Sequence, residues 1–199
     1  MEWEHLFDDL EGQLDAEWEA QRAALDAESE RLRISKLALR DRLRTVSGEP
    51  ETILLELISG DRWSATLSVL GADWLGACAE GDPRLRIVPL DAVQSIGLDH
   101  GRLLASLGPQ DAAPSLRERM GLGFVLRDLA RRRTPVQITL RSGATLHGTI
   151  DRAGSDHLDL AVHDPGEARR TRGVQGFRML PFGAVAWVRL SIGSAELID

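Results

Sequence analysis

The chain has 199 residues, and its 43% of hydrophobic residues excludes an intrinsically disordered protein. The net charge of −7 is concentrated in residues 1–33, which hold eleven Asp and Glu residues against three Arg. The single Cys78 excludes an intramolecular disulfide and a zinc site built from cysteines. No apolar run reaches the roughly 18 residues of a membrane span, and the acidic start of the sequence is unlike a secretory signal, so we expect a cytoplasmic protein.

Residues 1–47 predict an acidic helical arm, because they contain no proline and are rich in Ala, Leu, Glu, Gln and Arg. Apolar residues recur every three or four positions and mark one stripe along this helix. The residues of the stripe are Trp3, Phe7, Leu10, Leu14 and Trp18. The stripe either covers other parts of this chain or is offered to a second chain or another protein. The pattern fits one continuous helix as well as two helices joined near Ser29.

The rest of the chain contains two similar segments. The first begins at Leu55 with LELISGDRWSATLSVLGADWL, and the second begins at Ile138, 83 residues later, with ITLRSGATLHGTIDRAGSDHL. A second pair, RIVPLDAVQSIGL from Arg86 and RMLPFGAVAWVRL from Arg178, is 92 residues apart, so repeat two has nine additional residues between its segments. A period of this length is typical of a duplicated small domain.

Each repeat predicts five short strands. Alternating apolar residues and turn signals place strands at 53–57, 63–67, 136–140, 146–150 and 157–163. The third strand of repeat one contains Cys78, and each Pro-x-x-Ala-Val segment supplies two more strands. Gly60 and Gly143 follow the first strand of their repeats, where glycine tolerates the positive φ of a tight hairpin. Five short strands with close turns favour a small barrel, because closure leaves few unpaired edges.

A helix is expected at 115–133, entering repeat two, after a linker at 108–114. The predicted boundaries are 1–47 for the acidic helical arm, 48–107 for the first barrel, 108–134 for the linker and helix, and 135–199 for the second barrel.

The second repeat carries a pattern of Gly, Asp and apolar residues across its first hairpin and the strand that follows. The pattern consists of Leu140, Gly143, Gly148, Ile150, Asp156, Leu158 and Leu160. It resembles the first motif of Sm-like barrels of the LSm and Hfq type, and in repeat one Ala65 stands at the second Gly position. The resemblance implies an α+β fold in which a long N-terminal α-helical arm precedes two small five-stranded SH3-like (Sm-like) barrels, each preceded by a helix. PRC-type barrels, whose sequences resemble VPLDAVQSIG of repeat one, and other SH3-like barrels are the rivals.

Eight arginines are candidates for nucleic-acid contact, because guanidinium groups pair well with phosphates. They are Arg117, Arg119, Arg131, Arg132 and Arg133 in and before the predicted helix, and Arg169, Arg170 and Arg172 in the expansion of repeat two. Such clusters are also typical of a solubilising surface. Two observations favour a surface without nucleic acid: the pI of about 5.3, and the absence of the Asn and the Arg-Gly pair that RNA-binding Sm-like proteins carry.

Few residues suggest catalysis or metal binding. His157, Asp159 and His163 point to one side of a predicted strand, and we expect that side to be a solvated outer face. The two histidines would lie roughly 20 Å apart on an extended strand, too far for one metal ion. Gly121 and Gly123 are expected at a helix joint or in close helix packing rather than in a phosphate-binding loop. We therefore expect no catalytic residue, no metal and no cofactor.

The sequence favours a non-catalytic adaptor or regulatory protein that binds a protein partner, or self-associates, through its N-terminal helix, with no membrane and no small-molecule substrate. Leu54 and Ile58 lie on the nominally outward face of the first strand, where repeat two has Gln137 and Arg141, so they are the expected docking site of the arm. The alternative is an RNA-binding Sm-like post-transcriptional regulator that uses the arginine clusters. A small hydrolase is a third class, because catalytic triads assemble from distant positions.

Overall fold

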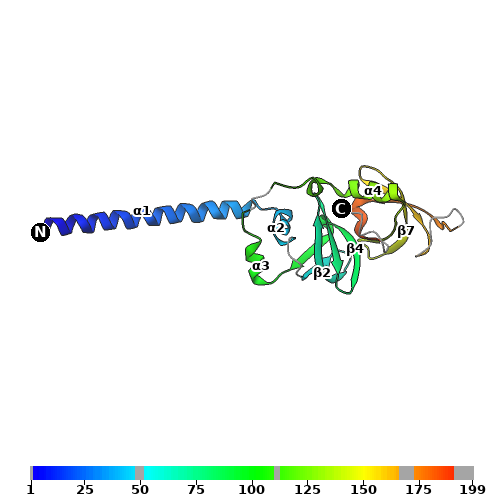
Figure 1. Ribbon diagram of the computed structural model, residues 1–199, viewed down its shortest axis with the longest axis horizontal. Helices are drawn as coiled ribbons and strands as arrows, with labels where there is room; N and C mark the ends of the chain where they lie inside the picture. The colour runs from blue at the N-terminus through cyan, green and yellow to red at the C-terminus, as the bar shows by residue number, and fades with distance from the viewer. Residues whose placement is uncertain (1, 48–51, 110–112, 166–172, 191–199) are drawn as a thin grey trace. The chain divides into compact units, whose positions relative to one another are not determined.

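The computed structural model describes residues 2–47, 52–109, 113–165 and 173–190, with side chains from residue 11 onward (Figure 1). The chain divides into two compact units, Met1–Leu39 and Arg40–Asp199. The first unit consists mainly of α1 (Glu2–Ser35), a helix of 34 residues that carries the ion pairs Glu28–Arg31 and Glu30–Arg33. Because the backbone is helical throughout this range, the break in the arm lies at residues 36–38 and not near Ser29.

The described residues of the second unit form three α-helices, of which two precede the repeats as expected. They are α2 (Leu39–Val46), α3 (His100–Ala105) and α4 (Leu122–Arg132). The predicted helix at 115–133 is interrupted, because a short 3₁₀ turn (Arg117–Arg119) ends before Gly121 and α4 begins after it. The N-terminus of α4 is capped by a residue far away in the sequence, since the backbone N–H of Leu122 donates to the Asp73 carboxylate at 2.7 Å.

Ten strands follow the predicted pattern in both repeats. They are β1 (Thr52–Leu57), β2 (Arg62–Leu70), β3 (Trp74–Ala79), β4 (Asp82–Pro89), β5 (Val93–Gly97), β6 (Pro135–Leu140), β7 (Thr145–Ala153), β8 (His157–Val162), β9 (Gly176–Pro181) and β10 (Val185–Leu190). A 3₁₀ turn separates the fourth strand from the fifth in each repeat. The additional residues of repeat two fall between its third and fourth strands, as the sequence predicts.

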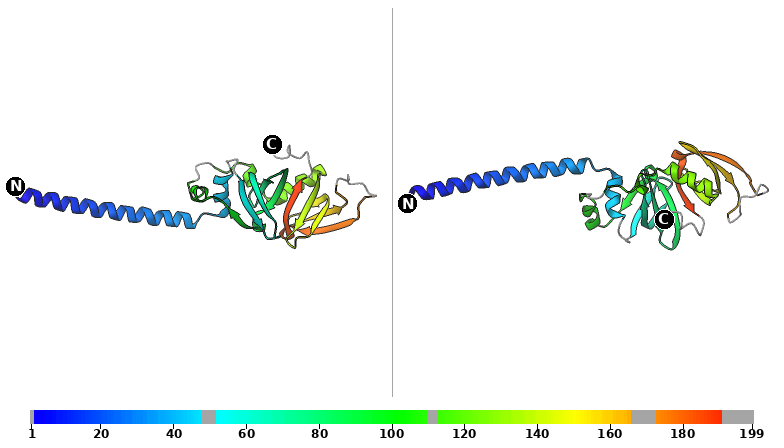
Figure 2. Two further views of the ribbon diagram at one scale, coloured as in Figure 1. Left: turned by 90° about the horizontal axis from the view of Figure 1, so that it is seen from below. Right: turned by 45° about the horizontal axis from the view of Figure 1, so that its top comes forward.

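The five strands of each repeat have the same spatial order. That order is β5-β1-β2-β3-β4 in the first half and β10-β6-β7-β8-β9 in the second, and β4 pairs with β10 to connect the halves. The junction is antiparallel, with Ile87 opposite Val188 and Arg86 opposite Arg189. Figure 2 shows β10 lying between β4 and β6.

The expectation of two separate barrels is therefore wrong in one respect: the strands form a single ten-stranded sheet that spans both halves and is not closed into a barrel. The physical reason lies in the unpaired backbone groups of an edge strand. β4 and β10 would each be an edge if the halves stood alone, and at the junction each strand supplies the hydrogen-bond partners of the other.

Glycine is required at two kinds of position. Gly60 and Gly143 have φ of +88° and +84° in the first hairpin turn of each repeat, which agrees with the expectation from the sequence. Gly148 has a different role, because a Cβ atom there would lie 2.3 Å from the carbonyl oxygen of Ala161 on the neighbouring strand.

Two hydrophobic cores fill the second unit, and each takes residues from both halves. The core of the second half includes Trp74 and Ile87 from β3 and β4. The core of the first half includes Ala186 and Trp187 from β10. The junction is therefore formed by shared packing as well as by backbone pairing.

Candidate functional site

The apolar stripe of the arm is exposed where its side chains are described. Leu14 and Trp18 have 55% and 63% of their surface exposed. Trp3, Phe7 and Leu10 lie in the α1 backbone, but their side chains lie outside the described residues.

The two residues expected to receive the arm lie at the start of the first repeat. Leu54 is half-buried in β1 opposite Gly97 of β5, and Ile58 is exposed just after β1. Docking of the arm on these two residues stays a prediction.

The predicted arginine clusters do not form one free basic surface. Arg131 and Arg132 both bind the Asp128 carboxylate, at 2.6 and 2.7 Å, and Arg133 binds Asp151 at 3.0 Å. Arg117 and Arg119 lie in the 3₁₀ turn before α4. Arg169, Arg170 and Arg172 lie outside the described residues.

The expectation that His163 lies on a solvated outer face is wrong. His163 follows the end of β8, so the strand alternation does not extend to it, and only 3% of its surface is exposed. Its Nδ1 lies 3.0 Å from the carbonyl oxygen of Asp164, and its Nε2 lies 2.9 Å from the Thr149 hydroxyl. Because a carbonyl only accepts, Nδ1 donates to Asp164, and Nε2 shares a hydrogen bond with the Thr149 hydroxyl. His157 instead pairs with Asp156 at 2.8 Å.

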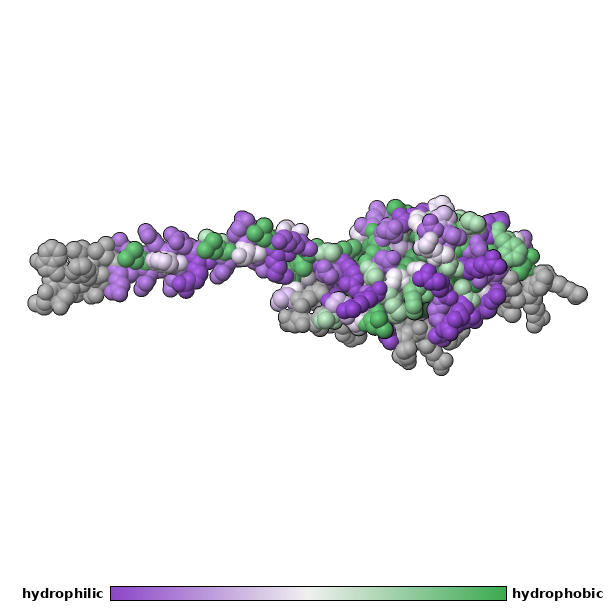
Figure 3. Space-filling model, turned by 90° about the horizontal axis from the view of Figure 1, so that it is seen from above, coloured by the Kyte–Doolittle hydropathy of each residue, from purple (hydrophilic) through white to green (hydrophobic). Residues whose placement is uncertain are grey.

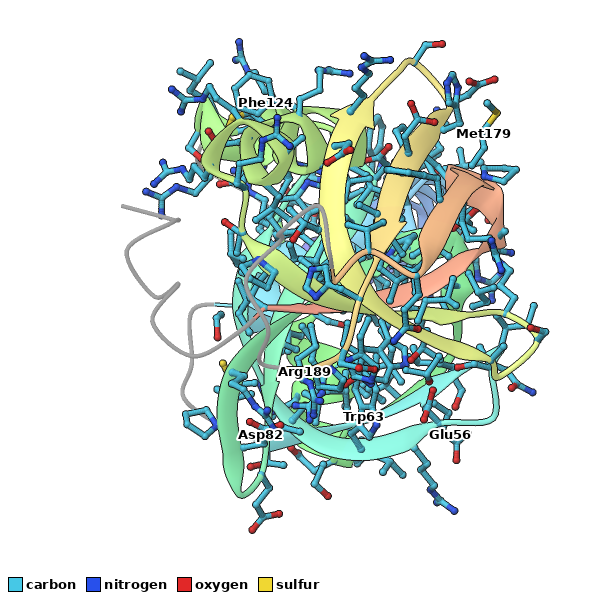
Figure 4. The ribbon with its side chains drawn as sticks, turned by 90° about the vertical axis from the view of Figure 1, so that its right-hand side faces the viewer. Glu56, Trp63, Asp82, Phe124, Met179 and Arg189 are labelled. Atoms are coloured by element: carbon cyan, nitrogen blue, oxygen red, sulfur yellow. The ribbon has the colours of Figure 1, made fainter. Side chains whose placement is uncertain are left out.

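A different group of charged residues gathers where β4 meets β10. Asp82, Arg84 and Arg86 alternate along β4 and share one face of the strand, and Arg189 of β10 joins them across the junction. Figure 4 shows Asp82 and Arg189 near Trp63 of β2. We call Asp82, Arg84, Arg86 and Arg189 the junction cluster.

Asp82 is the shared acceptor of the junction cluster. Its carboxylate binds Arg84 through two contacts, of 2.7 and 2.9 Å, and Arg86 through one contact of 2.7 Å. Arg189 lies 3.6 Å from the same carboxylate. The hydrogen bond from Arg84 holds the pKa of Asp82 well below its usual range, although burial acts in the opposite direction.

Arg86 is held between two tryptophans. Its guanidinium carbon lies 4.9 Å from the Trp63 ring centre and 5.9 Å from that of Trp187, within the range of cation–π attraction. Only 7% of Arg86 is exposed, and its Nε and Nη1 have no hydrogen-bond partner among the described residues. The Trp187 indole N–H donates to Asp61 at 2.7 Å, which fixes the ring that stacks on Arg86.

A cleft of about 370 Å³ opens beside the junction cluster. Its polar lining residues are Arg84, Gln137, His147, His163, Asp164 and Arg189. Arg189 donates to the Gln137 side-chain oxygen. Burial, together with the nearby Arg189 and His163, lowers the pKa of His147, so its ring is neutral at pH 7.

A smaller cavity of about 120 Å³ lies between α4 and the β3–β4 hairpin. Its lining is mainly apolar and includes Trp74, Leu85, Ile87, Phe124 and Leu129. The Trp74 indole N–H donates to the carbonyl of Met120 at 2.9 Å. Side chains of α4 in the second half and of β4 in the first half therefore line the same cavity.

The junction cluster carries only a partial signal in the sequence. The alternation of Asp82, Arg84 and Arg86 could have suggested a charged strand face. The contribution of Arg189 had no sequence signal, because this residue reaches the cluster only through the pairing of β4 with β10.

Comparison with protein-family models, with curated proteins and with solved structures gave no significant match. Within the described ranges, no three His, Cys, Asp or Glu side chains gather so that they could hold a metal ion. In the same part of the chain, no helix combines the length and the apolar character needed to cross a bilayer.

Proposed function

We propose that this protein is a non-catalytic cytoplasmic adaptor built from two Sm-like halves, which assembles through its sheet edges and binds a protein partner through α1. The strand order that recurs in both halves supports the Sm-like assignment. The motif residues of repeat two have matching structural roles: Gly143 has positive φ, Gly148 allows close strand approach, and Leu158 and Leu160 are fully buried.

The observation that carries the proposal is the difference between two equivalent strands, β4 and β9. Ile87 of β4 is 1% exposed, whereas Met179, at the equivalent position of β9, is 72% exposed. Phe177, which corresponds to Leu85, is also exposed, at 62%. Val88 of β4 faces the core of its own half, and Ile87 is covered by the core of the other half. β9 has the same outward apolar side chains without such a cover in the described part of the chain.

The strand that pairs with the edge of β9 is β5 of a second copy of this chain. β5 and β9 are the two ends of the described sheet, and they correspond to the strands that pair at the junction, β10 and β4. If β5 of one copy paired with β9 of another in the register that β10 has with β4, Ile96 would lie opposite Met179 and Gly97 opposite Arg178. Because the two surfaces differ, such a contact is head-to-tail and leads to closed rings or open chains.

The apolar stripe of α1 supports a second binding surface. Leu25 and Leu32 continue the line of Leu14 and Trp18, and all four side chains are more than half exposed. Figure 3 shows apolar side chains spaced among polar ones along the described part of α1. Apolar surface in water costs about 25 cal/mol per Å², so this stripe suits the groove of a partner protein.

Sedimentation of the full-length chain over a range of concentrations tests the edge contact. We expect the wild type to self-associate and Met179→Glu to weaken association by at least about tenfold, because the charge would be buried without a partner. Leu116→Glu is the matched control, since Leu116 is 80% exposed outside the sheet, and it should associate like the wild type. A wild type that stays monomeric, or equal effects of the two substitutions, would overturn the proposal.

A further inference from the structure

The junction cluster carries more positive than negative charge. Three guanidinium groups share the single Asp82 carboxylate, and all four side chains are at most about one-third exposed. Among the described residues that line the cleft, Asp164 is the one acidic residue, and its carboxylate accepts a hydrogen bond from Gln175. Half-buried positive charge without a negative partner lowers the stability of the folded protein unless an anion binds beside it.

Two of the arginines that carry this positive charge line one cleft together with other polar side chains. Arg84 and Arg189 line the cleft on the side of the junction cluster, and Gln137 and His147 line it as well. The volume of about 370 Å³ is sufficient for a small ligand. Guanidinium forks match the oxygen geometry of phosphate groups and can bind them through two hydrogen bonds at once.

We propose that this cleft binds the terminal phosphate of a small phosphorylated ligand through Arg84 and Arg189. A phosphate monoester carries a charge of about −1.5 to −2 at pH 7, which matches the surplus of the cluster. A backbone phosphodiester of RNA carries one negative charge and would leave part of the surplus uncompensated. The inference is independent of the proposed assembly, because the cleft lies beside β4 and β10 and not at the β5 or β9 edge.

His147 provides a reporter of the bound anion. Its ring lies in the cleft lining with Arg84, Arg189 and His163 as the cationic or titratable neighbours and Asp164 as the acidic one. A phosphate dianion placed among these groups would stabilise the protonated imidazole and raise the pKa of His147.

The test is a titration of the full-length protein with inorganic phosphate at constant ionic strength, followed by calorimetry and by the NMR signals of His147. We expect saturable binding, a rise in the pKa of His147, and a loss of affinity of at least about tenfold in Arg189→Gln. Arg84→Gln is the second variant, since its side chain is the more exposed of the two. Arg131→Gln, which removes an arginine bound to Asp128 on α4, is the matched control and should bind phosphate like the wild type.

Three results would overturn the inference. The first is the absence of saturable phosphate binding, and the second is an equal loss of affinity in Arg131→Gln and in the two cleft variants. The third comes from a single-stranded RNA oligonucleotide with hydroxyl ends. If this RNA binds more tightly than phosphate and loses affinity in Arg189→Gln, the cleft recognises a phosphodiester backbone instead.

Discussion

Asp82 organises the charged junction between the two halves. One carboxylate accepts from Arg84 and Arg86 and lies close to Arg189, so its ionised form is favoured in the folded protein. Since 17% of its side chain is exposed, water weakens these interactions only in part. The ionised Asp82 therefore contributes to the stability of the fold.

Asp82→Asn should destabilise the protein by about 2–3 kcal/mol at pH 7. The pKa of Asp82 is lower in the folded than in the unfolded state, so its contribution is complete above the unfolded value near 4 and is lost as the pH falls below it. Urea unfolding at several pH values should show the wild type and the variant converging in acid. Asp91→Asn, which alters an exposed carboxylate, serves as the control and should cost less than about 1 kcal/mol. A difference that does not change between pH 7 and pH 3 would contradict the role of Asp82.

Gly143→Val should destabilise the protein by roughly 1–3 kcal/mol, because valine does not tolerate the positive φ of the first hairpin turn. The matched control is Gly183→Ala in the 3₁₀ turn, where φ is not positive and an added Cβ would meet no neighbouring atom within 4 Å. Thermal unfolding compares the two variants. An unchanged melting temperature in Gly143→Val would show that the turn accepts another backbone conformation.

Local elements of the fold were largely predictable from the sequence. β1, β6 and β8 follow alternation with a period of two, and the first hairpins follow from Gly60 and Gly143, because both signals are local. The short helix α3 was not predicted, although Asp99, whose side chain accepts from the backbone N–H of Arg102 at 3.0 Å, is a local start signal for a helix. The junction cluster was missed because it depends on pairing between strands about 100 residues apart.

Deletion of residues 1–30 tests the predicted docking of the arm on Leu54 and Ile58. If the arm covers these apolar side chains, the deletion should increase the binding of a hydrophobic dye and promote aggregation. Ile58→Ser in the shortened chain should reduce the dye binding again. A shortened protein that stays monomeric, equally stable and free of dye would show that α1 is an independent tether.

The two halves form one body because each completes the core of the other. Trp74 and Ile87 enter the core of the second half, and Trp187 enters that of the first. The two halves therefore share an internal β4–β10 contact, and the corresponding strands β5 and β9 lie at the ends of the described sheet. The assembly that we propose repeats the internal contact between copies.

Cysteine cross-linking between copies tests this assembly most directly. Ile96→Cys and Met179→Cys would be made in separate full-length chains, each with Cys78→Ser to remove the native thiol. Residues directly opposite each other on antiparallel strands have Cβ atoms about 4.5–5.5 Å apart, close to the distance that a disulfide requires. Under oxidising conditions we predict a disulfide-linked dimer when the two variants are mixed and none when either is oxidised alone. A mixture without cross-links, or a single variant that cross-links to itself as readily as to the other, would contradict head-to-tail pairing of β9 with β5.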